Sequence, residues 1–247
     1  MKEEGVQVHY INLEKRKDRN DSFMRVNAAL ADFHRVDAVE GAHLQVDDLL
    51  REGLIQEPLR AYTAGALGDA LSHKKMWERC ASGEAPMTVA EDDAVFNRHF
   101  AEKAPAVLAR LPPDWDIVLW GWNFDSILHV EVIEGLKQSV MQFDASKLGV
   151  RTLDFREKKY DVLPLRLIGA FGTVCYSVSP KGAQRLSDLC FPLRNEVVPV
   201  PGLGRNILNF TIDTMLNKYY RALQSYASFP PLVWTENDKG TSDVKRG

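Results

Sequence analysis

The sequence predicts an α/β protein whose mainly parallel central sheet is flanked by helices on both faces. Short apolar or alternating segments, typical of strands, recur along the chain. Segments with apolar residues three and four positions apart, typical of amphipathic helices, separate them. Such alternation favours a parallel sheet buried between two helical layers. No shift in composition divides the sequence, so we expect a single domain over residues 1–247.

The first half of the chain alternates most clearly. Expected strands cover residues 6–13, 34–39, 86–90 and 115–122. Expected helices run through Phe23 and Leu30, within 46–62, over 65–81 and over 98–111. The segment 6–13 alternates apolar and polar side chains, whereas 115–122 has the nearly continuous apolar run of a buried strand.

The second half is less regular. Residues 123–163 contain short alternating segments and scattered charges, which indicate hairpins. The later elements expected are a strand over 169–179, a helix from Pro180 to Leu189, a turn-rich connector over 199–204, a helix beginning at Asp213 and a strand over 222–227. Proline suits the first turn of a helix, which supports the start at Pro180.

The composition limits the partners and the compartment. A net charge of −3 argues against nucleic-acid binding, which needs a basic excess. Three widely spaced cysteines favour reduced thiols over a disulfide frame or a zinc site. The start of the chain has no apolar signal segment, and no run reaches the roughly 18 apolar residues of a membrane span. We therefore expect a cytoplasmic protein without a transmembrane segment; a membrane-anchored substrate would still allow peripheral contact at the inner membrane.

The most informative motif is Glu91-Asp92-Asp93, three carboxylates directly after a short apolar strand. In open α/β sheets, ligands bind outside the carboxyl ends of strands, and carboxylate oxygens there can hold a hard divalent cation. Taken alone, the motif is equally compatible with a solvated loop after the strand.

A basic segment follows the first strand and contains Lys15, Arg16, Lys17 and Arg19. It is short and includes Asp18, so a phosphate or diphosphate matches its size better than nucleic acid does. The chain lacks the G-x-G-x-x-G, G-x-x-x-x-G-K-[ST] and G-x-S-x-G motifs, which argues against dinucleotide-binding, P-loop and α/β-hydrolase enzymes. The remaining combination favours an enzyme acting on a nucleotide-sugar, where a metal ion bridges the diphosphate leaving group.

Two alternatives stay open. A sugar nucleotidyltransferase also places carboxylates and a metal near a nucleotide, but it usually has a glycine-rich loop after its first strand. Here no glycine lies between Val6 and Gly41. The second alternative is a catalytically inactive domain that binds a sugar or a protein partner without turnover.

The helix over 65–81 has one apolar face. Its members recur at steps of four and three and are Ala66, Ala70, His73, Trp77 and Cys80. His73 therefore points inward, where a hydrogen-bonded core histidine is the ordinary alternative to a functional one.

The chain resembles glycosyltransferase family 25, the lipooligosaccharide galactosyltransferases and their collagen-modifying relatives. Five segments match in order: Ile11 to Arg19, Gly65 to His73, Glu91-Asp92-Asp93, Cys175 to Ser179 with Lys181-Gly182-Ala183, and Asp213 with the terminal Ser242-Asp243. The chain departs from the family pattern at Ala66 and Asp69, which stand where an acidic residue and a cysteine are common.

This resemblance implies a GT-A type fold and transfer of a hexose, commonly galactose, from a UDP-sugar to a glycan such as lipooligosaccharide, with inversion. A nucleotide-binding half would cover about residues 1–122 and an acceptor-side half about 123–247. Glu91 and Asp93 would face Mn²⁺ or Mg²⁺ on the diphosphate. Asp92 would point away from the ion or orient the other two carboxylates, because alternate residues of an extended segment face opposite sides.

The resemblance also implies roles for residues outside the acidic motif. The residues expected at the nucleotide are Asn12, Arg16, Arg19, Ser72 and Asp92, with Ser242 and Asp243 closing over it. Arginine suits bidentate phosphate contact. Asp213 is expected to be the general base for the acceptor hydroxyl, with simple helix capping as the alternative. His73 is expected to hold Asp93 or the donor phosphate in place.

Overall fold

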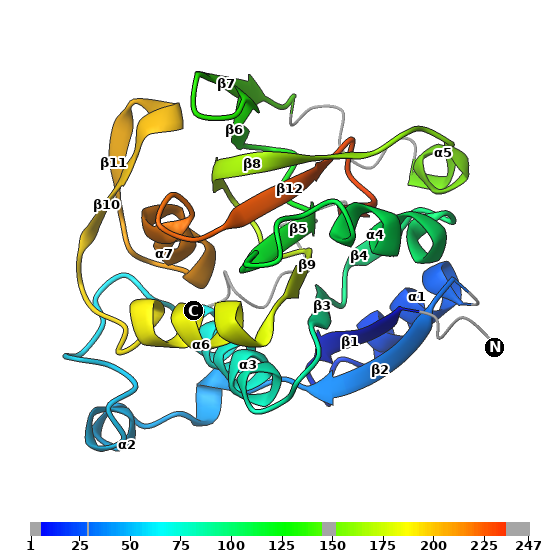
Figure 1. Ribbon diagram of the computed structural model, residues 1–247. Coiled ribbons are helices and arrows are strands. Elements are labelled where there is room, and N and C mark those ends of the chain that lie inside the picture. Colours follow the sequence, from blue (N-terminus) through cyan, green and yellow to red (C-terminus); the bar gives the residue numbers. More distant parts are fainter. Residues whose placement is uncertain (1–5, 29, 145–151, 236–247) are drawn as a thin grey trace.

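The computed structural model describes residues 6–28, 30–144 and 152–235 (Figure 1). Within these ranges, nine strands form one central sheet in the order β2-β1-β3-β9-β5-β12-β8-β6-β7. In that order the strands are Asp32–Asp37, Gln7–Asn12, Met87–Glu91, Cys175–Val178, Ile117–Gly121, Ser225–Phe229, Leu163–Ala170, Ile127–Ile133 and Lys137–Gln142. The predicted α/β class is confirmed.

The sheet is mixed in direction. Three neighbouring pairs are parallel, namely β2–β1, β1–β3 and β5–β12. The other five neighbouring pairs of the described sheet are antiparallel. Strand β9 lies antiparallel between β3 and β5, so two parallel groups are separated by a reversed strand. The arrangement is consistent with a GT-A-like fold, with more antiparallel pairing than the sequence pattern predicted.

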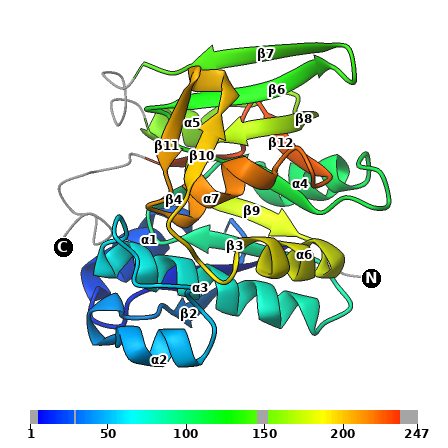
Figure 2. The same ribbon diagram turned by 90° about the vertical axis from the view of Figure 1, so that its left-hand side faces the viewer.

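Helices cover both faces of the sheet (Figures 1 and 2). On one face lie α3 (Ala64–Ala81), α6 (Pro180–Cys190) and α7 (Ile212–Tyr219). On the other lie α1 (Lys17–Asn27) and α4 (Phe100–Leu108). The short helices α2 (Val46–Arg51) and α5 (Thr152–Glu157) lie at the periphery. This is the two-sided cover that the sequence predicted.

Alternation along β5 shows how one strand serves both layers. Ile117 and Leu119 belong to the core beneath α3, α6 and α7, whereas Val118 and Trp120 belong to the core beneath α1 and α4. All of them are fully buried, because a strand covered on both sides has no solvent face. This explains the continuous apolar run in its sequence.

Two smaller strand pairs complete the fold. Strand β4 (Ala94–Phe96) pairs with β13 (Val233–Thr235), and β10 (Val197–Val200) pairs with β11 (Arg205–Leu208) around the 3-10 turn η3 (Pro201–Leu203). A second 3-10 turn, η1, covers Gly41–His43. The connector predicted over residues 199–204 is thus the tip of a hairpin.

The single strand predicted over residues 169–179 is wrong. The chain forms β8 up to Ala170, breaks, and forms β9 from Cys175. The break contains Gly172, whose φ of +88° favours glycine. A Cβ on Gly172 would also lie 2.4 Å from Oδ1 of Asn123.

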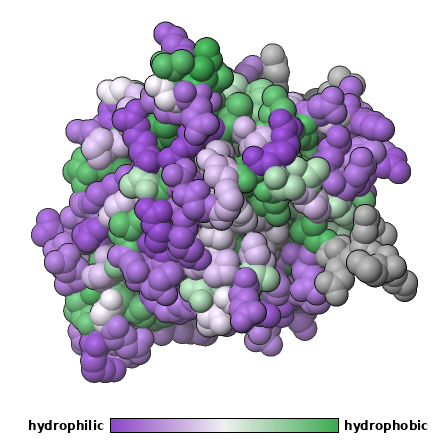
Figure 3. All heavy atoms as spheres, viewed as in Figure 1, coloured by the Kyte–Doolittle hydropathy of each residue, from purple (hydrophilic) through white to green (hydrophobic). Residues whose placement is uncertain are grey.

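Within the described ranges, no helix has both the length and the apolar character that crossing a bilayer requires. The face in Figure 3 is mostly hydrophilic, with small hydrophobic groups, one of them over the end of the β6–β7 hairpin. There Ile133 and Leu136 are 56% and 82% exposed.

Candidate active site

The candidate site begins where β1 and β3 end side by side. These strands are parallel, and Ile11 lies opposite Glu91 in their register. The residues that follow, Asn12 and Asp92, are therefore neighbours, and Asn12 Nδ2 donates a 2.6 Å hydrogen bond to Asp92 Oδ2. A pocket opens at this point, at the carboxyl ends of the strands as predicted for ligands of α/β sheets.

Arginines secure this wall of the pocket. Arg19, in the first turns of α1, forms an ion pair with Asp92 and lies 3.7 Å from Asp93 Oδ2. Arg35 Nε donates to Asn12 Oδ1 at 2.9 Å, which fixes the amide so that its NH₂ faces Asp92. Burial raises the pKa of Asp92, while Arg19 and Asn12 act against that shift.

Arg16 points elsewhere in the structure. Its guanidinium makes two 2.9 Å hydrogen bonds to the Asp18 carboxylate, which lowers the pKa of Asp18 to about 2. Arg19 lines the pocket and Arg16 does not. Arg19 forms the ion pair with Asp92, whereas Arg16 acts on Asp92 through its charge, which lowers the pKa of that carboxyl; a role of Arg16 at the nucleotide stays a prediction.

Helix α3 forms the opposite wall. Thr63 caps its first turn by accepting from the Ala66 N–H at 3.0 Å. Gly68 lets the loop after β2 approach closely, since a Cβ there would lie 2.5 Å from the Val39 carbonyl oxygen. The Ser72 hydroxyl closes the same contact by donating to Gly68 O and accepting from Val39 N. The hydroxyl predicted at the nucleotide is thus engaged in joining α3 to that loop, and its role there stays a prediction.

His73 lies at the base of this wall and is fully buried. Its Nδ1 is 3.0 Å from the Tyr176 hydroxyl, which also accepts a 2.8 Å hydrogen bond from Trp77 Nε1. Its Nε2 faces Asp69 Oδ1 at 3.6 Å and Glu91 Oε1 at 4.0 Å. The structure therefore directs His73 toward Asp69 and Glu91, not toward Asp93 as the sequence suggested. Burial lowers the pKa of His73 to about 3, so the ring is neutral.

The break between β8 and β9 binds two carboxylates of the candidate site. Thr173 Oγ1 donates to Glu91 Oε1 at 2.6 Å, and the Gly172 N–H donates to Asp213 Oδ2 at 2.8 Å. Asp213 is the second residue of α7 and also accepts from the Thr211 hydroxyl. The same short loop therefore orients a carboxylate of the acidic motif and the carboxylate of Asp213.

The site concentrates negative charge. Burial, together with the nearby carboxylates of Asp213, Asp93 and Asp92, raises the pKa of Asp69 to about 7. Burial likewise raises the pKa of Glu91 well above its ordinary value, with Asp93, Asp69 and Asp213 adding to the shift. Carboxylates from β3, α3 and α7 thus lie within electrostatic reach of one another.

The carboxylate oxygens of the site could hold a hard cation together with a bound ligand, but not by themselves. Among the described residues, no three His, Cys, Asp or Glu side chains are placed to hold a metal ion together. Mg²⁺, however, is usually held by one or two carboxylates plus substrate phosphates. Asp93 Oδ1 is buried and lacks a hydrogen-bond partner in the described structure. Glu91 and Asp93 therefore fit a cation that is shared with a bound diphosphate.

Of the predicted site residues, Asn12, Arg19, Ser72, Glu91 and Asp92 line one pocket. His73 faces Glu91, Asp93 approaches Arg19, and Asp213 is bound by the loop that also binds Glu91, so these three lie next to the lining residues. Ser242 and Asp243 lie outside the described residues. The sequence reasoning missed Asp69 and Thr173 as site residues. Asp69 could have been found, because it precedes His73 by four positions and shares its helix face.

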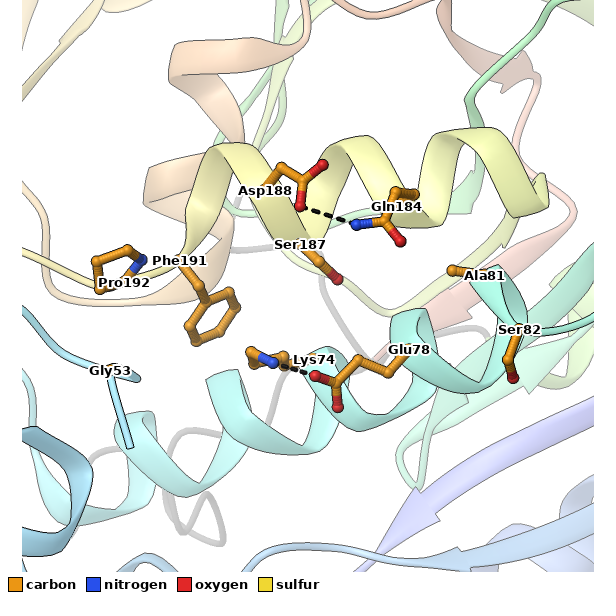
Figure 4. A pocket seen from close by; sticks show the side chains of 10 residues that line it. All are labelled: Gly53, Lys74, Glu78, Ala81, Ser82, Gln184, Ser187, Asp188, Phe191 and Pro192. Atoms are coloured by element: carbon orange, nitrogen blue, oxygen red, sulfur yellow. Dashed lines mark hydrogen bonds and ion pairs between the residues drawn. The ribbon is translucent and has the colours of Figure 1, made fainter. Parts of the chain in front are cut away.

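A larger hollow, of about 520 Å³, lies elsewhere, between α3 and α6 (Figure 4). Its polar groups largely satisfy one another: Lys74 pairs with Glu78, and Gln184 donates to Asp188 at 2.8 Å. It contains none of the converging carboxylates. The smaller acidic pocket is therefore the stronger candidate for chemistry.

The chain is similar to known glycosyltransferases. The model described as Glycosyltransferase family 25 (LPS biosynthesis protein) matches residues 6–200. Procollagen galactosyltransferase 2 of Mus musculus is 26% identical over 245 residues, which cover 95% of this chain and 36% of that protein. A Glycosyltransferase 25 family member of Anopheles gambiae is 30% identical over 125 residues, covering 46% of this chain and 21% of that protein. The chain thus spans about a third of the first relative and a fifth of the second.

Proposed function

The chain belongs to glycosyltransferase family 25, and from this premise we propose that it moves a hexose from a UDP-sugar to a hydroxyl group of a glycan acceptor, with inversion at the anomeric carbon. Galactose is the proposed sugar, because two relatives that match this chain are named galactosyltransferases. Lipooligosaccharide is the proposed acceptor class, since the family description names lipopolysaccharide biosynthesis. A cytoplasmic location with contact at the inner membrane belongs to the same proposal.

One observation carries the proposal: the acidic motif and Asp213 lie far apart in the sequence but meet at the loop of Gly172 and Thr173, beside the pocket that Glu91 and Asp92 line. Glu91 and Asp213 are joined through the Thr173 and Gly172 hydrogen bonds of a single loop. Transfer from a nucleotide-sugar needs a diphosphate site and a proton acceptor on the two sides of the anomeric carbon. The pocket offers carboxylates in both positions.

On the donor side, Asn12 and Arg19 hold Asp92 in place, which leaves Glu91 and Asp93 to face the diphosphate. When bound between these carboxylates and the diphosphate, Mn²⁺ or Mg²⁺ would neutralise the charge that develops on the leaving group. Arg19, within 3.7 Å of Asp93, adds a fixed positive charge at the same place. Crowded carboxylates that repel one another are expected to favour such cationic ligands.

On the acceptor side, Asp213 would act as general base. The acceptor oxygen attacks the anomeric carbon as its proton passes to Asp213, and the bond from that carbon to UDP breaks with its electron pair on UDP. Hydrogen bonds from Gly172 and Thr211 fix the Asp213 carboxylate in advance. Such preorganisation of a catalytic base reduces the cost of reaching the transition state.

The experiment is UDP release from a panel of UDP-sugars, with and without Mn²⁺, for the wild type and Asp93→Ala, with UDP binding by calorimetry on the same samples. Metal-dependent release from one donor that requires Asp93 would support the proposal and name the donor. UDP binding without release from any donor, even with glycan acceptors present, would favour an inactive binding domain. No UDP binding by the wild type would refute the site assignment.

A further inference from the structure

Asp69 is a pocket carboxylate that accepts no hydrogen bond from the described residues. It extends from α3 into the pocket, and its side chain is 23% exposed. Its nearest cationic or donor group is His73 Nε2, at 3.6 Å. Asp92, across the same pocket, is held by both Asn12 and Arg19. Asp69 therefore keeps its acceptor capacity for something that enters the pocket.

The tautomer of His73 follows from its neighbours. An indole N–H can only donate, so Tyr176 accepts from Trp77 and directs its own O–H proton to His73 Nδ1. With Nδ1 as an acceptor, the neutral ring carries its proton on Nε2. That N–H is buried, has no hydrogen-bond partner in the described structure, and faces Asp69 and Glu91. A buried chain of three side chains thus presents a donor to the Asp69 side of the pocket.

The position of Asp69 indicates which part of a ligand it would meet. The charges of Asp213, Asp93 and Asp92 all act on Asp69, and Asp69 lines the pocket together with Glu91 and Asp92. In the proposed reaction, the transferred sugar lies between the leaving diphosphate and the attacking hydroxyl. A carboxylate repels phosphate but accepts hydrogen bonds from hydroxyl groups. A sugar ring in the pocket provides such hydroxyl groups.

We propose that Asp69 is a specificity-determining residue that accepts hydrogen bonds from hydroxyl groups of the transferred hexose, and that His73 is a positioning residue that orients the Asp69 carboxylate. This subsite rests on the proposed function, because it requires a UDP-hexose donor. It assigns discrimination among donor sugars to α3, whereas the acidic motif holds the nucleotide diphosphate common to all of them.

The test compares UDP with UDP-hexose, which share every group except the sugar. Calorimetry with Mn²⁺ would measure both affinities for the wild type, Asp69→Asn and the control Asp188→Asn, which alters an exposed carboxylate on α6. We expect Asp69→Asn to weaken UDP-hexose binding about tenfold or more, as for loss of a charged hydrogen bond. UDP affinity should change less than about twofold, and Asp188→Asn should match the wild type.

The outcomes separate the proposals. Equal weakening of UDP and UDP-hexose by Asp69→Asn would place Asp69 in the nucleotide or metal site and overturn the sugar subsite alone. The sugar subsite would also be overturned if Asp69→Asn kept the wild-type preference for UDP-hexose over UDP. The same holds if the wild type bound UDP-hexose no more tightly than UDP. Failure of the wild type to bind UDP at all would instead remove the proposed function, and the subsite with it.

Two further variants test the proposed role of His73. His73→Gln keeps an N–H donor near the position of Nε2, whereas His73→Leu removes it. Retained preference for UDP-hexose in the Gln variant and its loss in the Leu variant, with UDP affinity unchanged in both, would support positioning. Equal effects of both variants on UDP and UDP-hexose would show a merely structural histidine.

Discussion

Two carboxylate regions of this molecule have opposite surroundings. Asp116, next to β5, is fully buried and surrounded by donors: it pairs with Arg185, lies 3.1 Å from Lys181, and accepts from the Gln224 N–H at 2.8 Å. In the acidic pocket, by contrast, Asp69 and Glu91 have other carboxylates as their main charged neighbours. In the described structure Asp116 has two cationic partners, whereas Asp69 and Glu91 have none.

The difference teaches how to separate a structural carboxylate from a functional one. The two regions differ in burial, since Asp116 is fully buried and the Asp69 and Glu91 side chains are 23% and 29% exposed, but the sign of the neighbouring charges separates them more clearly. A buried carboxylate with cationic partners is a structural group, because removing it leaves those cations buried without a partner and destabilises the fold. A group of like charges is unfavourable by itself and is explained by a ligand that relieves it. Substitutions in the two regions should therefore have opposite effects on stability and activity.

The largest effect is expected from Glu91→Gln and Asp93→Asn. Each removes a charge that would stabilise the leaving diphosphate, so we expect sugar transfer to fall on the order of 10³-fold. Thermal unfolding of the free protein should be unchanged or occur at higher temperature, because repulsion decreases. Assays of UDP release and of unfolding would check both points; transfer within tenfold of the wild type would contradict the assignment.

Asp213→Asn tests the acceptor side of the same pocket. The amide oxygen can still accept from Gly172, but it cannot take a proton, so we expect kcat to fall about 10²- to 10⁴-fold. UDP affinity, measured by calorimetry, should stay within about twofold of the wild type. A normal kcat would show that Asp213 only caps α7 and that the base lies elsewhere.

Asp116→Ala should produce the reverse pattern. Removing this carboxylate leaves Lys181, Arg185 and a backbone N–H without their partner, at a cost of about 3 kcal/mol in the free energy of unfolding. Urea denaturation would measure the loss. The folded variant should bind UDP like the wild type. Little change in the free energy of unfolding, together with impaired UDP binding, would contradict the assignment of Asp116 to a structural role.

The smallest effect concerns pH. Asp69 has a folded-state pKa of about 7 against an ordinary 3.8, so the folded protein retains a proton that the unfolded chain releases within this window. Its contribution to stability is present below about pH 4 and is lost as the pH rises through about 7. The unfolding temperature of Asp69→Asn relative to the wild type should therefore increase from pH 4 to 7 in metal-free buffer. A constant difference would contradict the shift.

Periodicity made much of the fold predictable. The helix over 65–81 could be placed because its apolar residues form one buried face. The strands ending at Asn12 and Glu91 could be placed because they are short segments with mostly buried side chains. The break at Gly172 could not be placed, since the residues on both sides of it are apolar and suit one continuous strand. Its cause is tertiary: the close approach of Asn123 and the hydrogen bond to Asp213.

The candidate site divides in the same way. The strand-end rule located the acidic motif, but the expected alternation of Glu91, Asp92 and Asp93 fails because β3 ends at Glu91 and a turn follows. The direction of His73 was predictable from its helix face. Its actual neighbours were not, because Tyr176 lies 103 positions away and only the folded sheet brings them together.

Equilibrium binding of UDP tests the central claim most directly. It would be measured with and without Mn²⁺ for the wild type, Asp93→Asn and Asp116→Asn, at a temperature where all three are folded. The account predicts metal-dependent binding by the wild type and Asp116→Asn, and binding at least tenfold weaker by Asp93→Asn. Equal binding by all three proteins, or no binding by any, would contradict it.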